Sequence, residues 1–189
     1  MPRYDIVEGS IIPGSPAEVW DAVVDELSGR TAWWRRHVQQ HLRGNRPLAE
    51  RGAVVEGRLG PAGDSLAPRF AMRTLAAEPP HRLLFEHFEG MFRGAEEWTF
   101  APAQGGTKVR VRWVTRTYGL YSLLGPLLFF VDVAKTHRQF LRDGFRSLSV
   151  HMEKRRKMNR PFRAAAFALA GAALAADHQT MVLEPLKEV

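Results

Sequence analysis

Residues 107–117 show a side-chain period of two, and this pattern restricts the fold more than any other feature of the chain. One face carries Val109, Val111, Trp113 and Thr115, and the other carries Lys108, Arg110, Arg112 and Arg116. Successive side chains of a strand point to opposite faces of a sheet. The segment is therefore typical of an antiparallel strand with one buried face and one solvated, basic face.

The same period recurs upstream. Strands are predicted at 53–59, 69–78, 83–89 and 92–101, and turn residues separate them at intervals of about 10–15 residues, as in a meander. Another strand is predicted at 3–12, so the sheet should have about six strands.

Two short helices are predicted between the first strand and the next. Ser15 suits the N-cap, Pro16 the first helical position, and Glu18 completes a capping box. The second short helix is expected over about residues 31–42, which include Trp33 and Trp34.

A long helix is predicted over residues 131–157. Its apolar stripe carries Phe130, Val133, Ala134, His137, Leu141, Phe145, Leu148 and Met152. The order of strand, two helices, five strands and long helix indicates an α+β fold, with the helix packed on one face of the sheet.

The composition excludes several chemistries. The chain has no cysteine, so disulfides, thiolate catalysis and cysteine-ligated metals are ruled out. We predict no metal site and no cofactor, because no adjacent cluster of acidic residues supports any of the seven histidines. A glycine-rich phosphate loop and the GxSxG pattern of esterases are both absent from the sequence.

The net charge of +7 favours an anionic partner, such as an acidic lipid surface or an acidic ligand. An arginine-rich composition is also typical of proteins from GC-rich genomes. No nucleic-acid-binding motif is visible, so nucleic acid is not expected as a partner. The first nine residues lack the apolar core of a secretory signal, and we therefore expect a cytoplasmic protein.

Several short motifs, in this order and spacing, resemble the START/Bet v 1-like (SRPBCC) superfamily, especially its bacterial polyketide cyclase/dehydrase and lipid-transport branch. They are PAEVW at 16–20, PHRL at 80–83, EWTFAP at 97–102 and GGTKV at 105–109. The resemblance covers about residues 3–157. It implies a helix-grip fold, in which a curved antiparallel sheet of about six strands wraps on the long C-terminal helix. Members of the superfamily include lipid carriers, hormone receptors, cyclases and co-chaperones, so the resemblance does not identify an activity.

A curved sheet cannot lie flush on a straight helix, so this fold implies a cavity for a hydrophobic small molecule or lipid. We expect the residues that face inward from the strands and the long helix to contact that ligand. They are Phe70, Met72, Phe85, His87, Trp98, Phe100, Val111, Trp113, Thr115, His137, Leu141 and Phe145.

Three of the inward positions are ionisable. His87 shares strand parity with Phe85, Glu96 shares it with Trp98, and His137 lies on the apolar stripe of the long helix. These three residues are the candidates for general acid–base catalysis. The alternative is that His87 and Glu96 form a structural hydrogen-bonded pair, or that a histidine lies at the solvated rim.

The mouth of the cavity and the C-terminal tail could both contact a membrane. The mouth is expected to include the apolar stretch 120–131. Residues 154–163 carry six positive charges, and the apolar run 164–176 that follows is too short to span a bilayer. We predict a ligand-binding domain over 1–157 and a basic, alanine-rich extension over 158–189. The basic charges of this extension would allow peripheral contact with the inner face of an anionic membrane. Alternatively, the tail would dock on a second copy of the chain and form a homodimer.

Three functions compete. The first is binding or carriage of a hydrophobic ligand, and we expect this one because no catalytic constellation in the sequence is complete. The second is an enzyme of the polyketide cyclase/dehydratase type that uses His87, Glu96 or His137. The third is an interaction module that acts through its tail. A polar pair about 3 Å apart inside an open cavity would favour the enzyme.

Overall fold

The computed structural model describes residues 3–60, 67–119 and 132–181, with side chains described as far as residue 158. The chain divides into two compact units, residues 1–152 and residues 153–189. The first unit holds the sheet and the second is helical as far as Met181. Among the described residues, no helix combines the length and the hydropathy that a bilayer span requires.

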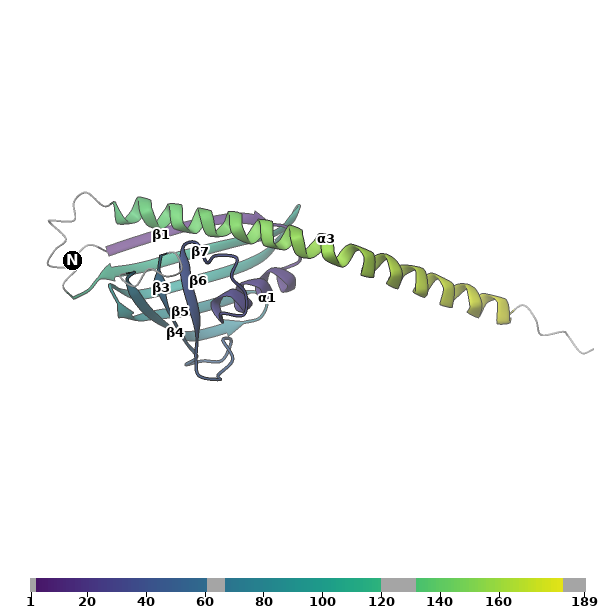
Figure 1. Cartoon of the computed structure of the whole chain (residues 1–189), viewed down its shortest axis with the longest axis horizontal. Coiled ribbons are helices and arrows are strands. Elements are labelled where there is room, and N and C mark those ends of the chain that lie inside the picture. The colour runs from purple at the N-terminus through teal and green to yellow at the C-terminus, as the bar shows by residue number, and fades with distance from the viewer. Residues whose placement is uncertain (1–2, 61–66, 120–131, 182–189) are drawn as a thin grey trace, which may run out of the picture. The chain divides into compact units, whose positions relative to one another are not determined.

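Seven antiparallel strands form one sheet in the order β1-β7-β6-β5-β4-β3-β2 (Figure 1). The strands are β1 Arg3–Ile12, β2 Val38–Arg43, β3 Val54–Leu59, β4 Arg69–Glu78, β5 Arg82–Gly90, β6 Phe92–Ala103 and β7 Gly106–Thr117. All six predicted strands are confirmed, each with bounds within two residues of the expected ones. The alternation at 107–117 is confirmed as well, because Val109, Val111 and Trp113 are buried.

The predicted helix over residues 31–42 is wrong. Residues 38–43 form β2, which pairs with β3 from Val38 opposite Leu59 to Arg43 opposite Val54. The residues before it are held by the buried carboxylate of Glu26. That carboxylate accepts hydrogen bonds from the Thr31 hydroxyl at 2.8 Å and from the backbone N–H groups of Trp33 at 2.8 Å and Trp34 at 3.0 Å. These non-local partners outweigh the local helical pattern.

The first short helix, α1, spans Pro16–Leu27 and begins with the predicted capping box. The Glu18 backbone N–H donates to Ser15 Oγ at 3.3 Å, and the Ser15 backbone N–H donates to Glu18 Oε2 at 2.9 Å. Trp20 on its inner face meets Phe100 of β6 edge-on, with ring centroids 5.4 Å apart. This contact places α1 against the same face of the sheet that the long helix covers.

The long helix, α3, spans Val133–Met181 and is longer than predicted. Within the first unit it runs alongside β1 (Figure 1). Its predicted stripe is buried at Leu141, Phe145, Leu148 and Met152.

Two contacts hold this part of α3 on the sheet. Glu8 of β1 accepts from Arg138 at 3.2 Å and from Arg142 at 3.1 Å. Burial favours the neutral acid, but the hydrogen bonds and charges of the two arginines outweigh it and lower the pKa of Glu8. The second contact is between the Trp34 indole and the backbone at Gly144. A Cβ added to Gly144 would lie only 2.5 Å from Cε2 and Cζ2 of Trp34.

We predict that Gly144→Ala lowers the free energy of unfolding by about 1–3 kcal/mol. Alanine in a helix is normally favoured over glycine by about 1 kcal/mol, so the sign of the effect reports the clash with Trp34. Urea unfolding monitored by circular dichroism measures it. In a Trp34→Phe background the same substitution should cost less, because the smaller ring leaves room. A stabilising Gly144→Ala would contradict the packing described.

Candidate ligand-binding cavity

A cavity of about 270 Å³ lies in the first unit, between the sheet and the first turns of α3. Every strand except β1 contributes to its wall. The described lining residues are Leu27, Trp34, Val38, Gln40, Leu59, Phe70, Met72, His87, Glu89, Met91, Phe92, Glu96, Trp113, Val133, Thr136, His137, Phe140 and Leu141. The void that the curved sheet implied is therefore present.

Half of the predicted ligand contacts line this cavity. They are Phe70, Met72, His87, Trp113, His137 and Leu141. The others are buried in the surrounding core and do not reach the lining: Phe85, Trp98, Phe100, Val111, Thr115 and Phe145. Contact of any of these residues with a ligand stays a prediction.

The predicted acid–base candidates His87 and Glu96 form a pair on the cavity wall. His87 Nε2 lies 2.9 Å from Glu96 Oε2, and the side chains are only 10% and 12% exposed. The other oxygen, Glu96 Oε1, accepts from the Trp98 indole N–H at 2.6 Å. Adjacent strands provide this geometry, because Glu96 on β6 faces Phe85 on β5 and Gly94 on β6 faces His87.

The carboxyl group of Glu96 is held in its ionised form. Burial is the largest influence and raises its pKa, but the hydrogen bonds from His87 and Trp98, with the attraction of His87 and His137 in their protonated forms, together outweigh burial and lower the pKa. An ionised carboxylate can only accept hydrogen bonds, so His87 Nε2 is the donor in the pair. The ring nitrogen of His87 left for a ligand is therefore Nδ1.

His137 of α3 completes this region of the wall. Its ring stacks on Trp113 with centroids 3.9 Å apart, and Trp113 also meets His87 edge-on at 6.5 Å. Burial lowers the pKa of His137 to about 4, and the charge of Glu96 only partly opposes this shift. His137 is therefore neutral at neutral pH, and its Nε2 is buried with no hydrogen-bond partner among the described residues.

Sequence reasoning missed three aromatic side chains of the wall, which are Trp34, Phe92 and Phe140. Phe140 stacks on Trp34 with ring centroids 4.6 Å apart, and it lies 5.7 Å from the His137 ring. Its position three residues after His137 was a usable signal, because residues at i and i+3 share a helix face. Trp34 had no comparable local signal, because the Glu26 carboxylate and Gly144 place it.

The structure describes no metal centre. His37 and His41 are four residues apart, a spacing that would align two ligands on a helix. Here His37 precedes β2 and meets Phe140 edge-on, whereas His41 Nε2 lies 3.2 Å from Glu56 Oε1 at the surface. Across the described ranges, no group of three or more metal-ligating side chains is assembled. The predicted mouth at 120–131 lies outside the described residues.

We predict that His137 makes the protein less stable in mild acid. Its folded pKa of about 4 lies below the usual value of about 6.5, so the unfolded chain takes up the proton first as the pH falls. From pH 7 to pH 4.5 this linkage should remove about 2 kcal/mol from the free energy of unfolding. The pKa of Glu96 is lowered from its usual value, so the stability that depends on its ionisation is lost mainly below this window.

Urea unfolding at the two pH values tests this expectation. His137→Phe keeps a ring against Trp113 and should reduce the loss by that amount. His41→Phe is the control, because the His41 side chain is 64% exposed. This variant should lose as much free energy of unfolding between the two pH values as the wild type. Equal losses in the wild type and His137→Phe would show that His137 is not buried in its neutral form.

Comparison with solved structures shows the fold. The structure of the KanY protein matches with a TM-score of 0.58 and 20% identity, covering 81% of this chain and 99% of that chain. Ara h 8.0201 matches with a TM-score of 0.59 and 15% identity, again over 81% and 99%. A Thermus thermophilus protein gives a TM-score of 0.57 and 16% identity over 78% and 99%. The predicted helix-grip fold is confirmed.

A search of the curated proteins found no match to the chain. Among protein families, the model described as polyketide cyclase / dehydrase and lipid transport matches residues 5–153. That range covers the sheet except the first two residues of β1, together with α1 and the first turns of α3, and it contains every described residue of the cavity wall. The match spans more than half of the chain, so this protein belongs to the polyketide cyclase / dehydrase and lipid transport family.

Proposed function

We propose that this protein binds an apolar small molecule in the cavity between the sheet and α3. The composition of the wall carries the proposal: twelve of the eighteen described lining residues are apolar, and five of those are aromatic. Ligand sites in proteins are mostly apolar with a few placed polar groups. Three of the six polar residues of the wall, His87, Glu96 and His137, lie around Trp113.

The size of the cavity supports the same function. Its volume of about 270 Å³ is close to the lower end of the range for small-molecule sites, roughly 300–1,000 Å³. A packed interior would hold few voids larger than a water molecule. A void of this size with an apolar wall suits a ligand of a few fused rings or a short acyl chain.

Native mass spectrometry of the purified protein, followed by organic extraction, tests the proposal. A co-purifying molecule of defined mass, or stoichiometric uptake from a lipid and small-molecule extract, is the expected result. A mass that stays that of the bare chain after incubation with such extracts would contradict ligand binding in the cavity.

We further predict that Leu141→Trp blocks the cavity. Leu141 lines it, so the indole can occupy the void, and the free energy of unfolding should change by less than about 1.5 kcal/mol. Ligand uptake should fall at least about tenfold. Fluorescence titration and urea unfolding measure the two effects.

Leu148→Trp is the matched control, because Leu148 is as buried on α3 as Leu141 but is not part of the wall. Overpacking at that position should cost about 1–3 kcal/mol. Equal destabilisation by the two tryptophans, with ligand uptake intact in Leu141→Trp, would place the ligand elsewhere.

The His87–Glu96 pair favours a second function, acid–base catalysis of the cyclase/dehydratase type. The sequence suggested that a polar pair about 3 Å apart in an open cavity would point to an enzyme, and this pair has its N···O distance of 2.9 Å on the cavity wall. An ionised carboxylate that accepts from Nε2 would orient the ring and leave Nδ1 to take a proton from a bound ligand.

Proton abstraction from 5-nitrobenzisoxazole tests this second function. The substrate is neutral, has two fused rings, and opens to a coloured phenolate when a base removes its C–H proton and the N–O bond breaks. We expect a rate at least about 100-fold above free imidazole. His87→Gln should lose most of that rate, and His41→Gln, which removes the exposed pair with Glu56, should keep it. No acceleration by the wild type would contradict catalysis and leave ligand binding standing.

Four expectations from the sequence stay predictions. They are the division of the chain after residue 157, peripheral contact of the basic tail with an anionic membrane, a homodimer, and a cytoplasmic location. Deletion of residues 158–189 with loss of liposome binding and intact ligand uptake would support the membrane contact.

A further inference from the structure

The described residues of the cavity wall include no lysine or arginine. Its charged members are Glu89 and Glu96, and its two imidazoles belong to His87 and His137. The undescribed residues of the first unit, 1–2, 61–66 and 120–131, contain no lysine or arginine either. None of the 27 lysines and arginines of the chain is therefore among the described residues of the wall. Arg43, Arg58 and Arg69 line a separate pocket that shares Phe70 and Glu89 with the cavity.

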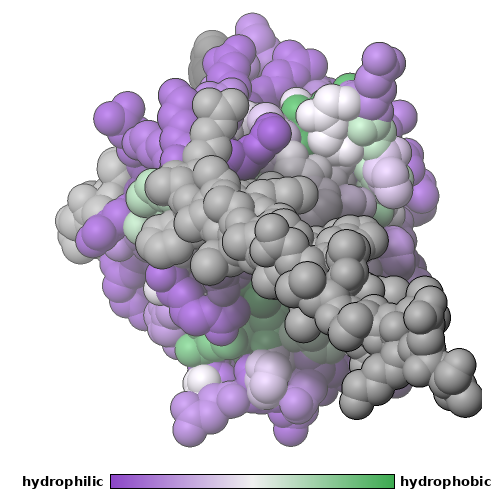
Figure 2. Space-filling model, turned by 90° about the vertical axis from the view of Figure 1, so that its right-hand side faces the viewer, coloured by the Kyte–Doolittle hydropathy of each residue, from purple (hydrophilic) through white to green (hydrophobic). Residues whose placement is uncertain are grey.

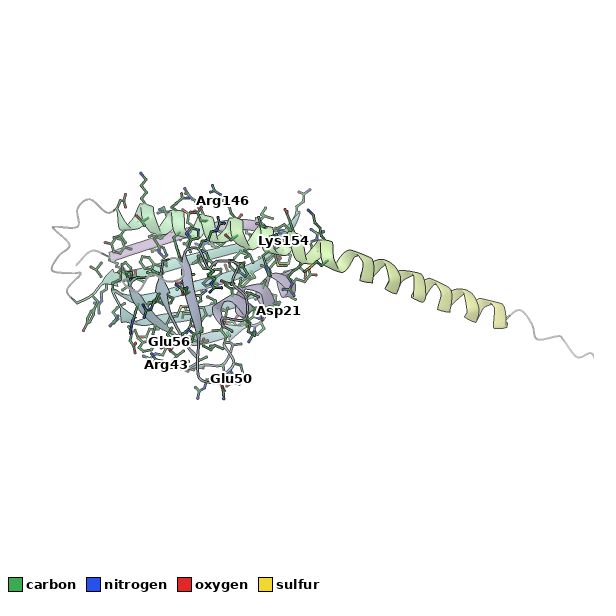
Figure 3. All side chains as sticks on the ribbon, in the orientation of Figure 1. Asp21, Arg43, Glu50, Glu56, Arg146 and Lys154 are labelled. Atoms are coloured by element: carbon green, nitrogen blue, oxygen red, sulfur yellow. The ribbon has the colours of Figure 1, made fainter. Side chains whose placement is uncertain are left out.

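The arginines with described partners lie on the exterior of the first unit instead. Arg138 and Arg142 on α3 form ion pairs with Glu8, and Arg112 forms an ion pair with Asp5 on the outer face of the sheet. Figure 3 shows Arg43 and Arg146 at the periphery of the first unit, and Arg146 is 76% exposed. Hydrophilic side chains dominate much of the coloured surface in Figure 2.

Local charge decides which ligands can enter. The ionised Glu96 repels a nearby anion in a region of low dielectric constant, where charges interact more strongly than in water. The attraction from the net charge of +7 acts over longer distances and is screened beyond about 8 Å at physiological salt. A buried anion without a cationic partner also loses its hydration, which is costly.

Three buried polar atoms of the wall lack a partner among the described residues. They are Nε1 of Trp34, Nε2 of Gln40 on β2 and Nε2 of His137 on α3. An amide N–H donates, and a neutral imidazole donates at one nitrogen and accepts at the other. Hydroxyl and carbonyl oxygens satisfy such groups without bringing a charge into the cavity.

Building on the proposed function, we infer that the ligand is an uncharged apolar molecule with a hydroxyl or carbonyl oxygen, and that the cavity rejects anions such as fatty acids and acidic phospholipids. This inference departs from the acidic ligand that the net charge alone favours. It also separates the partner of the cavity from any anionic partner of the exterior.

Three probes that share one ring system test the inference: naphthalene, 2-naphthol and 2-naphthoate. Fluorescence titration at pH 7 gives their dissociation constants. We expect 2-naphthol to bind at least about tenfold more tightly than 2-naphthoate, because the carboxylate meets Glu96 and no cation. Naphthalene reports whether the cavity accepts an apolar ligand at all.

Glu96→Gln removes the charge and keeps the size of the side chain, and it should reduce the preference for naphthol over naphthoate at least about fivefold. Glu97→Gln is the control. Glu97 follows Glu96 on β6 but is not among the described residues of the wall, and its carboxylate lies 2.6 Å from Arg82. Its loss should therefore change the preference less than about twofold.

The outcomes separate the inference from the proposed function. Failure of all three probes to bind would contradict ligand binding itself. If naphthalene binds and 2-naphthoate binds as tightly as 2-naphthol, the cavity accepts anions and the inference is overturned. A preference that persists unchanged in Glu96→Gln would overturn the role of Glu96.

Discussion

The rest of this structure depends on how α3 packs on the sheet. Trp34 packs against the bare backbone of Gly144, and Glu8 of β1 holds Arg138 and Arg142. With the helix fixed in this position, the inward curve of the sheet leaves a space that the side chains do not fill. The cavity is a consequence of that mismatch in shape, and Trp34 and Phe140 form part of its wall.

The polar region near Trp113 follows from the same arrangement. Glu96 would not remain ionised in an apolar wall without the hydrogen bonds of His87 and Trp98, because burial alone favours the neutral acid. His137 is kept neutral by burial. Two imidazoles in different environments, next to one fixed carboxylate, provide the kind of asymmetry that both ligand recognition and acid–base chemistry use.

Membership of the polyketide cyclase / dehydrase and lipid transport family is compatible with either function, because one fold supports many activities. The features that separate them belong to this chain. The wall is largely apolar, its described residues include no lysine or arginine, and its histidine–glutamate pair lies within hydrogen-bond distance.

The sequence by itself determined six of the seven strands, the capping box at Ser15 and the inward parity of His87, Glu96 and Trp113, because side-chain period and caps are local properties of the chain. The tertiary structure decided the rest. Residues 38–43 became β2 because β3 offers them a pairing partner and Glu26 holds the segment before them. The choice between core and cavity wall, as between Trp98 and Trp113, also depended on where α3 lies, and contacts between distant residues set that position.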